Sequence, residues 1–231
     1  MIKILFSILA LASTCASFAG SLEDAAAANA RGDYKAEVAI TRPLAEKGIA
    51  WAQGFLGDSY RAGQGVEQDY NESLKWFRLA AEQGYAGAQH NLAVMYENGH
   101  GVAQNYKQAG NFFRLAAQNG RADSQFSLGK IYAKGQGVIQ DYKEAAKWYR
   151  LAAEQGDEKA QANLALLYAN GQGVIQDYTL AHMWFNLAAA NGAASGHKNR
   201  DLIAARMTTQ QIEIAQKMAR NCEATKYKNC Y

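Results

Sequence analysis

Apolar and small residues recur along this chain with the spacing of short amphipathic helices. Ala160, Leu164 and Tyr168 follow one another at intervals of four residues, which places them on one face of a helix. Shortly before them, Ala145, the aromatic residues 148–149 and Ala152 form a second apolar stripe of the same kind. Glycines separate the two stripes. The pattern predicts a pair of helices joined by a glycine-containing turn.

This arrangement returns every 36 residues. The repeat is marked by a boundary glycine, at Gly48, Gly84, Gly120, Gly156 and Gly192. Between these glycines the same residue types recur in columns, most clearly leucine at Leu56, Leu92, Leu128 and Leu164, and a large aromatic residue at Trp76, Phe112, Trp148 and Trp184. Thirteen of the 21 glycines occupy recurring positions, whereas the chain has one proline, so the glycines are expected to have fixed structural roles.

Two kinds of signal predict where the helices end and begin. Gly171 and its equivalents are placed to end the first helix of each repeat in a left-handed cap, and Gly173 allows the connection to turn tightly. Asp69 with Glu72, Asn105 with Gln108, and Asp141 with Glu144 have the spacing of a capping box at the start of the second helix. Asp177 is followed by Leu180, so the last repeat keeps half of that signal. The alanines of the second helix allow close approach, and its aromatic residues are expected to fill the gap between repeats.

These columns resemble the Sel-one-like repeat family, a relative of the tetratricopeptide repeats. The family pattern A-x-x-x-L-G/A-x-x-Y, then G-x-G-V, then D-Y-x-x-A-x-x-W and A-A-x-x-G, is matched almost position by position. The resemblance implies an all-α fold, a right-handed α-solenoid of antiparallel helix pairs. It implies four 36-residue repeats over 48–191 and a partial capping repeat over 20–47. The remaining residues, 192–231, are expected to form a partial repeat, a capping helix and a tail closed by a disulfide.

The outer units depart from the repeat pattern, as the water-exposed ends of a solenoid require. At the front, Ile40 replaces the aromatic residue and Pro43 is expected to kink its helix. At the back, Arg200 replaces the leucine. A closing helix with a polar face is expected to begin at Thr208 or Thr209 and to reach about Arg220.

The first 19 residues read as a secretory signal peptide. Lys3 supplies the positive charge, 4–12 is a short apolar run, and Ser17-Phe18-Ala19 provides small residues before a cleavage site. Cys15 leaves lipidation open, although the residues before it lack the usual leucine. The expected location is periplasmic or secreted, with no transmembrane segment after cleavage. In such an oxidising compartment Cys222 and Cys230 are expected to form a disulfide that staples the terminus.

Charge and motif content argue against several function classes. The 24 basic and 21 acidic residues are evenly mixed, which argues against nucleic acid as the partner. The Gly-x-Gly segments lack the lysine of a phosphate loop, and no nucleophile elbow occurs. The histidines, His90, His100, His182 and His197, lack the spacing of a zinc helix. We therefore expect no catalytic residue, no metal and no cofactor, and interpret the chain as a binding protein instead of an enzyme.

Positions that vary between repeats are free to specify a partner. Three such columns lie on the first helices: Gly54, His90, Phe126 and Ala162; Asp58, Val94, Lys130 and Leu166; and Arg61, Glu97, Ala133 and Ala169. In the family the first helices line the concave groove, so the resemblance implies partner contacts at Asp58, Arg61, His90, Glu97, Phe126 and Lys130.

The sequence thus predicts an exported scaffold or adaptor that binds another protein or peptide through this groove. Two alternatives stay open. One is a cell-wall-fragment or β-lactam binding protein or hydrolase, although the relatives associated with that activity carry a cysteine pair within each repeat, which is absent here. The other is a regulator or assembly factor of an envelope complex, which differs from the adaptor only in its partner.

Overall fold

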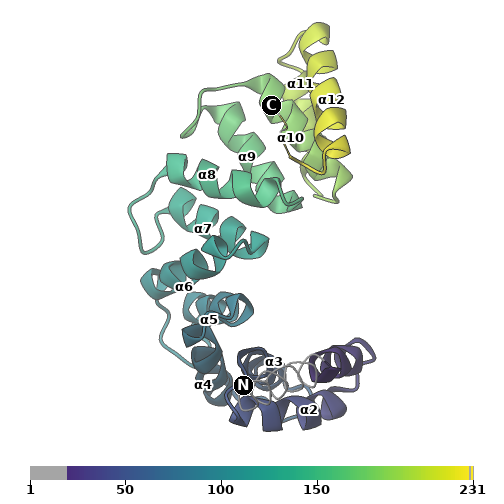
Figure 1. Ribbon diagram of the computed structural model, residues 1–231. Helices are drawn as coiled ribbons and strands as arrows, with labels where there is room; N and C mark the ends of the chain where they lie inside the picture. Colours follow the sequence, from purple (N-terminus) through teal and green to yellow (C-terminus); the bar gives the residue numbers. More distant parts are fainter. Residues whose placement is uncertain (1–19, 229, 231) are drawn as a thin grey trace, which may run out of the picture. The chain divides into compact units, whose positions relative to one another are not determined.

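The computed structural model describes residues 20–228 and 230, and in this part of the chain all regular structure is helical (Figure 1). The expected signal peptide and Cys15 lie outside the described residues. The chain divides into two compact units, residues 1–104 and 105–231. The all-α solenoid that the repeat predicts is confirmed, since consecutive helices pack as pairs within each unit.

The first unit begins with a helix over 20–30 that the sequence analysis did not place. It continues with four helices of equal length, α2 (Tyr34–Glu46), α3 (Ala50–Ala62), α4 (Tyr70–Glu82) and α5 (Ala86–Asn98). Each packs against the next along the chain. Pro43 lies inside α2, which continues past it to Glu46.

The second unit contains seven helices among its described residues. They are α6 (Tyr106–Gln118), α7 (Ala122–Lys134), α8 (Tyr142–Ala153), α9 (Glu158–Asn170), α10 (Tyr178–Ala190), α11 (Gly196–Ala204) and α12 (Thr209–Ala224). The closing helix α12 packs on α10. The helix begins where the sequence predicted, with Thr208 as its N-cap in a capping box with Gln211, but it ends at Ala224, beyond the expected Arg220.

We call α3, α5, α7, α9 and the equivalent α11 the first helices, and α2, α4, α6, α8 and α10 the second helices. The leucine column of the first helices, at Leu56, Leu92, Leu128 and Leu164, is fully buried. Small residues let the second helix approach: a Cβ added at Gly57 would lie 2.7 Å from the ring of Phe77, and one at Gly129 would lie 2.6 Å from Tyr149. The aromatic column that begins at Phe77 therefore fills the space between paired helices, and Trp76 and Trp148 lie just beside it with 8% and 9% of their surface exposed.

The predicted helix ends are confirmed at the first helices. Gly63, Gly99, Gly135 and Gly171 each cap a first helix in the left-handed conformation, with φ between 65° and 73°. The second glycine of each turn has a further role. A Cβ on Gly101 would lie 2.8 Å from the carbonyl oxygen of Tyr70, and Gly173 approaches Tyr142 in the same way. Each turn thus packs against the start of the second helix of the preceding repeat.

The capping boxes predicted for the second helices form only in part. Asp69 accepts hydrogen bonds from the backbone N–H groups of Asn71 and Glu72, so the N-cap is present. The Glu72 carboxylate, however, accepts from Trp76 Nε1 at 3.0 Å and from Lys75 Nζ at 3.0 Å. The carboxylate is therefore used along its own helix, because two donors lie one turn away on the same face.

A buried glutamine column, whose purpose the sequence analysis did not identify, connects neighbouring helix pairs. The side-chain Nε2 of each glutamine donates to a carbonyl at the end of the preceding second helix at 3.1–3.2 Å, for Gln53, Gln89, Gln125 and Gln161. Each of these carbonyls also accepts from the backbone N–H of the boundary glycine, for example from Gly48 at 2.9 Å, so the glutamine provides a second bond and ties the next first helix to this helix end. The amide at the end of the next second helix then donates to the glutamine oxygen, as from Gln155 to Gln125 at 2.7 Å.

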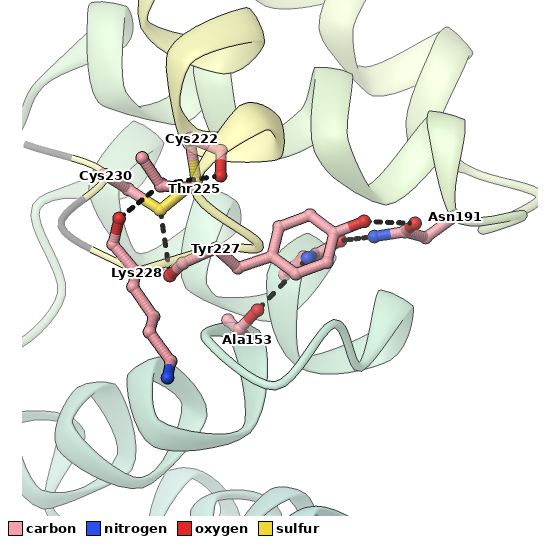
Figure 2. The surroundings of a disulfide bond; sticks show 8 residues. Ala153, Asn191, Cys222, Thr225, Tyr227, Lys228 and Cys230 are labelled. Atoms are coloured by element: carbon pink, nitrogen blue, oxygen red, sulfur yellow. Dashed lines mark hydrogen bonds between the residues drawn. A yellow bond between two sulfur atoms is a disulfide. The ribbon is translucent and has the colours of Figure 1, made fainter.

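The C-terminal tail closes this series of hydrogen bonds (Figure 2). Cys222 and Cys230 are joined by a disulfide, as the sequence led us to expect. Within the loop that they close, the Tyr227 hydroxyl donates to Asn191 Oδ1 at 2.8 Å. Asn191 in turn donates to Gln161 at 2.9 Å, and Gln161 donates to Ala153. Asn191 thus makes the amide bond that Gln83 and Gln155 make in earlier repeats, and the Tyr227 hydroxyl adds one further bond to it.

Candidate binding surface on the first helices

In the first unit, Asp58 is the centre of a polar network. Its carboxylate accepts from Arg61 at 3.0 Å and from the Asn91 amide of α5 at 3.0 and 3.1 Å. Asp58 and Arg61 remain about two-fifths exposed, with side-chain exposures of 42% and 41%. These two predicted contact residues therefore neutralise each other and connect neighbouring first helices, while still reaching solvent.

Burial also affects a carboxyl group behind this network. Glu37 on α2 is 2% exposed and accepts a hydrogen bond from Asn29 Nδ2 at 2.8 Å. Burial raises the pKa of Glu37, the bond from Asn29 opposes that rise, and the negative charge of Asp58 adds to it. The fold thus disfavours the charged form of a carboxyl group close enough to Asp58 to feel its charge.

The other predicted contacts occupy different environments. His90 and Glu97 lie half-buried on α5. Phe126 on α7 packs against the hydrophobic core of the second unit, with its ring centroid 5.8 Å from that of Tyr149. Lys130 lies one turn further along α7 and is half-buried. Phe126 thus serves mainly to hold the helix pair together, whereas Lys130 has a position suited to a surface contact.

The second unit contains an apolar pocket, and none of the predicted contact residues lines it. Its volume is about 430 Å³, and it lies between α9, α10 and α11. Its lining residues are Leu166, Ala169, Asn170, Phe185, Asn199, Leu202, Ile203, Ala205 and Arg206. Two of them are large apolar side chains in contact with water, Leu166 at 40% and Leu202 at 59% exposure.

The pocket belongs to the variable columns of the sequence. Leu166 continues the column of Asp58 and Lys130, and Leu202 is the next member, 36 residues later. Ala169 and Ala205 continue the column of Arg61 in the same way. The signal that could have identified the pocket was thus present in the columns. The predicted contacts, however, are mostly the polar members of these columns, and the residues after 192 were predicted to form only a partial repeat.

In the described range, no group of three or more His, Cys, Asp and Glu residues is placed to hold a metal ion. His182 is buried on α10, where burial and the charge of Arg200 lower its pKa and Asp201 acts in the opposite direction. Over the same described residues, no helix is long and apolar enough to cross a membrane. The features of this surface that could contribute to binding are its shape, its apolar area and its charged side chains.

Comparison with known proteins identifies the repeat. A family model described as Sel1 repeat matches residues 52–85, 86–120, 122–157 and 158–192, which together make up more than half of the chain. The chain belongs to the Sel1 repeat family. Sel1 repeats generally form protein-interaction scaffolds and are typically non-catalytic. No curated protein matches the chain.

Solved structures of similar Sel1 repeat proteins show the same fold. A Sel1 repeat protein from Oxalobacter formigenes is 35% identical, with a TM-score of 0.66 over 71% of this chain and 48% of its own. A protective antigen of uropathogenic Escherichia coli with an SLR fold is 28% identical, with a TM-score of 0.52 over 84% of this chain and 58% of its own. This chain therefore spans about half the length of these two relatives. A putative Sel1 repeat protein from Klebsiella pneumoniae, 21% identical with a TM-score of 0.52 over 78% of this chain and 89% of its own, agrees in fold alone.

Proposed function

We propose that this Sel1 repeat protein is an exported scaffold that binds another protein or peptide through the surface of its first helices. The observation that carries the proposal is the apolar pocket between α9, α10 and α11. The columns that build the repeat account for the buried leucines, aromatic residues, glutamines and capping glycines. Leu166 and Leu202 lie outside those columns and keep 40% and 59% of their surface exposed.

Leu166 and Leu202 stand out because they line a pocket, whereas similarly exposed leucines such as Leu115, at 45%, do not line it. Transfer of apolar area from water stabilises a complex by about 25 cal/mol per Å². A pocket already formed before binding requires little ordering on contact, so more of that energy remains as affinity. Partner binding is therefore the function that this surface supports best.

Export is the second part of the proposal. It is supported by the disulfide between Cys222 and Cys230, because such bonds persist in oxidising compartments. The apolar run and small residues before position 20 have the order of a secretory signal. Treatment of intact cells with a thiol-blocking reagent, followed by a non-reducing gel shift of the mature protein, tests this point. Free thiols at both cysteines would contradict export.

Site-specific photo-cross-linking in intact cells tests the binding surface. A photoreactive residue is placed at Lys130 or Leu202 on first helices, and at Lys107 or Lys143, which are exposed on second helices of the same unit. We expect a discrete cross-linked product from the first-helix positions and none of that mass from the second-helix positions. Equal products from both sets, or products from the second helices alone, would contradict the proposed surface.

A further inference from the structure

Two isoleucines of the second unit are exposed almost completely. Ile139 and Ile175 have 91% and 90% of their surface in contact with water, whereas every other large apolar side chain in the described part of the chain is exposed to 59% or less. They occupy the same position of successive repeats, in the turn that leads from a first helix to a second helix. In the first unit this position is held by Glu67 and Ala103. The exposed aliphatic pair is therefore a feature of the second unit alone.

The two turns belong to one continuous edge of the second unit. A Cβ on Gly137, in the turn that contains Ile139, would lie 2.5 Å from the backbone nitrogen of Lys107 at the start of α6. Gly173 in the next turn makes the same approach, at 2.5 Å, to the backbone nitrogen of Lys143 at the start of α8. Because Lys143 closely follows Ile139 along the chain, the turns and the helix starts adjoin one another. In Figure 1 the turns that lead into α8 and α10 project from the same side of this unit.

The charged side chains of this edge include three lysines without partners. Lys134 ends α7 immediately before the first turn, and Lys107 and Lys143 lie at the helix starts. All three are exposed, and none of them forms an ion pair among the described residues. The acidic residues Asp141 and Asp177 accept hydrogen bonds from backbone N–H groups as the N-caps of α8 and α10. The edge thus combines unpaired positive charge with two protruding aliphatic side chains.

This combination suits a lipid surface better than a protein groove. Lysines and glutamines separate the two isoleucines, so the turns lack the continuous apolar area that forms the centre of a protein interface. At a bilayer surface, single apolar side chains can enter the boundary between headgroups and acyl chains, while lysines contact anionic headgroups. The turn over 62–71 in the first unit contains Glu67 and Asp69 and no basic residue, so it has neither property.

We propose that this edge holds the second unit on the surface of an anionic lipid bilayer. The two isoleucines enter the interface, and the lysines contact lipid phosphates. The residues of the edge are Lys107, Lys134, Ile139, Lys143 and Ile175. None of them lines the pocket between α9, α10 and α11, so this inference goes beyond partner binding and does not depend on it.

Flotation with lipid vesicles tests the proposal on the mature protein from residue 20 onward. One set of vesicles contains equal parts of phosphatidylglycerol and phosphatidylcholine, and the other contains phosphatidylcholine alone. We expect the protein to float with the anionic vesicles and to be released from them as salt increases, because salt screens the lysines. With the neutral vesicles the protein should stay in the unbound fraction.

Isoleucine variants test insertion into the bilayer. Ile139→Ser combined with Ile175→Ser should lower the partition coefficient for anionic vesicles about tenfold or more, because the apolar contribution of both side chains is lost. Leu115→Ser is the matched control. Leu115 is 45% exposed near the opposite end of α6, so its replacement should leave the partition coefficient unchanged.

Lysine variants test the contribution of local charge. Lys107→Glu combined with Lys143→Glu should lower the partition coefficient about tenfold or more. Lys198→Glu combined with Lys217→Glu changes the net charge equally on exposed positions of α11 and α12, outside the edge, and should lower the coefficient only about twofold. Circular dichroism confirms that each variant is folded.

Several results would overturn the proposal. Equal binding to both kinds of vesicle, or equal effects of the two lysine pairs, would remove the role of the edge lysines, and unchanged binding of the isoleucine variant would remove insertion. If the protein binds neither vesicle, the lipid assignment is wrong, and sedimentation equilibrium of the isoleucine variant then shows whether these side chains join two copies of the chain instead. Photo-cross-linking at Lys130 and Leu202 does not depend on these outcomes, so a failure here is distinguishable from a failure of the scaffold function.

Discussion

At the scale of single residues, Glu37 shows how a side chain on the helix surface is drawn into the core by repeat packing. Its position on α2 is 2% exposed because α3 covers that face. Asn29 supplies one hydrogen bond to the carboxylate, but Asp58 adds a like charge. The folded state therefore holds the proton of Glu37 more tightly than the unfolded chain does.

The sign of the resulting pH dependence follows from this difference. Because the pKa of Glu37 is raised on folding, stability falls as pH rises from the ordinary value of 4.5 through the raised value. Glu37→Gln keeps an acceptor for Asn29 and removes the titration. The variant should melt at a higher temperature than the wild type at pH 7, and at nearly the same temperature below pH 4.5. Scanning calorimetry at both pH values provides the check, and a constant difference between the two proteins would contradict the assignment.

At the scale of elements, the turn between the helices of one repeat also joins that repeat to the one before it. Gly171 ends α9 in the left-handed conformation, and Gly173, with φ of +69°, then passes close to the backbone of Tyr142 at the start of α8. Gly173 is required for two reasons: its backbone has a positive φ, and a Cβ at this position would collide with Tyr142. The regular stacking of helix pairs depends on this close approach.

Two glycine substitutions separate these requirements. Gly192→Ala introduces strain at φ of +98° but meets no atom within 4 Å, so it should cost about 1 kcal/mol. Gly173→Ala introduces similar strain and also collides with Tyr142, so it should cost about 2–4 kcal/mol. Urea unfolding of both variants measures the difference. Equal losses of stability would show that the close approach has no energetic weight.

At the scale of the whole molecule, a solenoid must close its ends. After the last Sel1 repeat, α12 packs on α10, and the disulfide loop places Tyr227 over Gly156 and against Asn191. These segments cover the face of the last helix pair without a further repeat. The loop itself is held by a covalent link and by the Tyr227 hydroxyl.

Removal of the Tyr227 hydroxyl and removal of the disulfide should lower the free energy of unfolding by different amounts. Tyr227→Phe deletes the bond to Asn191 and should cost about 1 kcal/mol. Cys230→Ser opens a short loop and should cost about 2–3 kcal/mol in the chain-entropy model. Chemical unfolding of each variant, with the wild type under reducing conditions as a reference, gives both values. A Cys230→Ser variant as stable as the oxidised wild type would show that the tail does not cap the repeats.

The sequence alone predicted the parts of this protein that every repeat must share. The 36-residue spacing placed the helix pairs, the capping glycines and the buried leucine column, because helix geometry acts over a few residues and repeats the same solution. It also supplied the variable columns in which the candidate surface lies. The four Sel1 repeats were recognisable from residue types alone, for the same reason.

Only the tertiary structure showed which contacts the variable positions make within the fold. The ring of Phe126, a predicted partner contact, packs on Tyr149, and Asp58 pairs with Arg61 and Asn91; their contacts with a partner stay a prediction. Leu202 continues a variable column, but only the packing of α9, α10 and α11 places it with Phe185 and Ile203 around a pocket. Whether a side chain is used within the fold or left for a partner depends on neighbours from other helices, and local spacing does not contain that information.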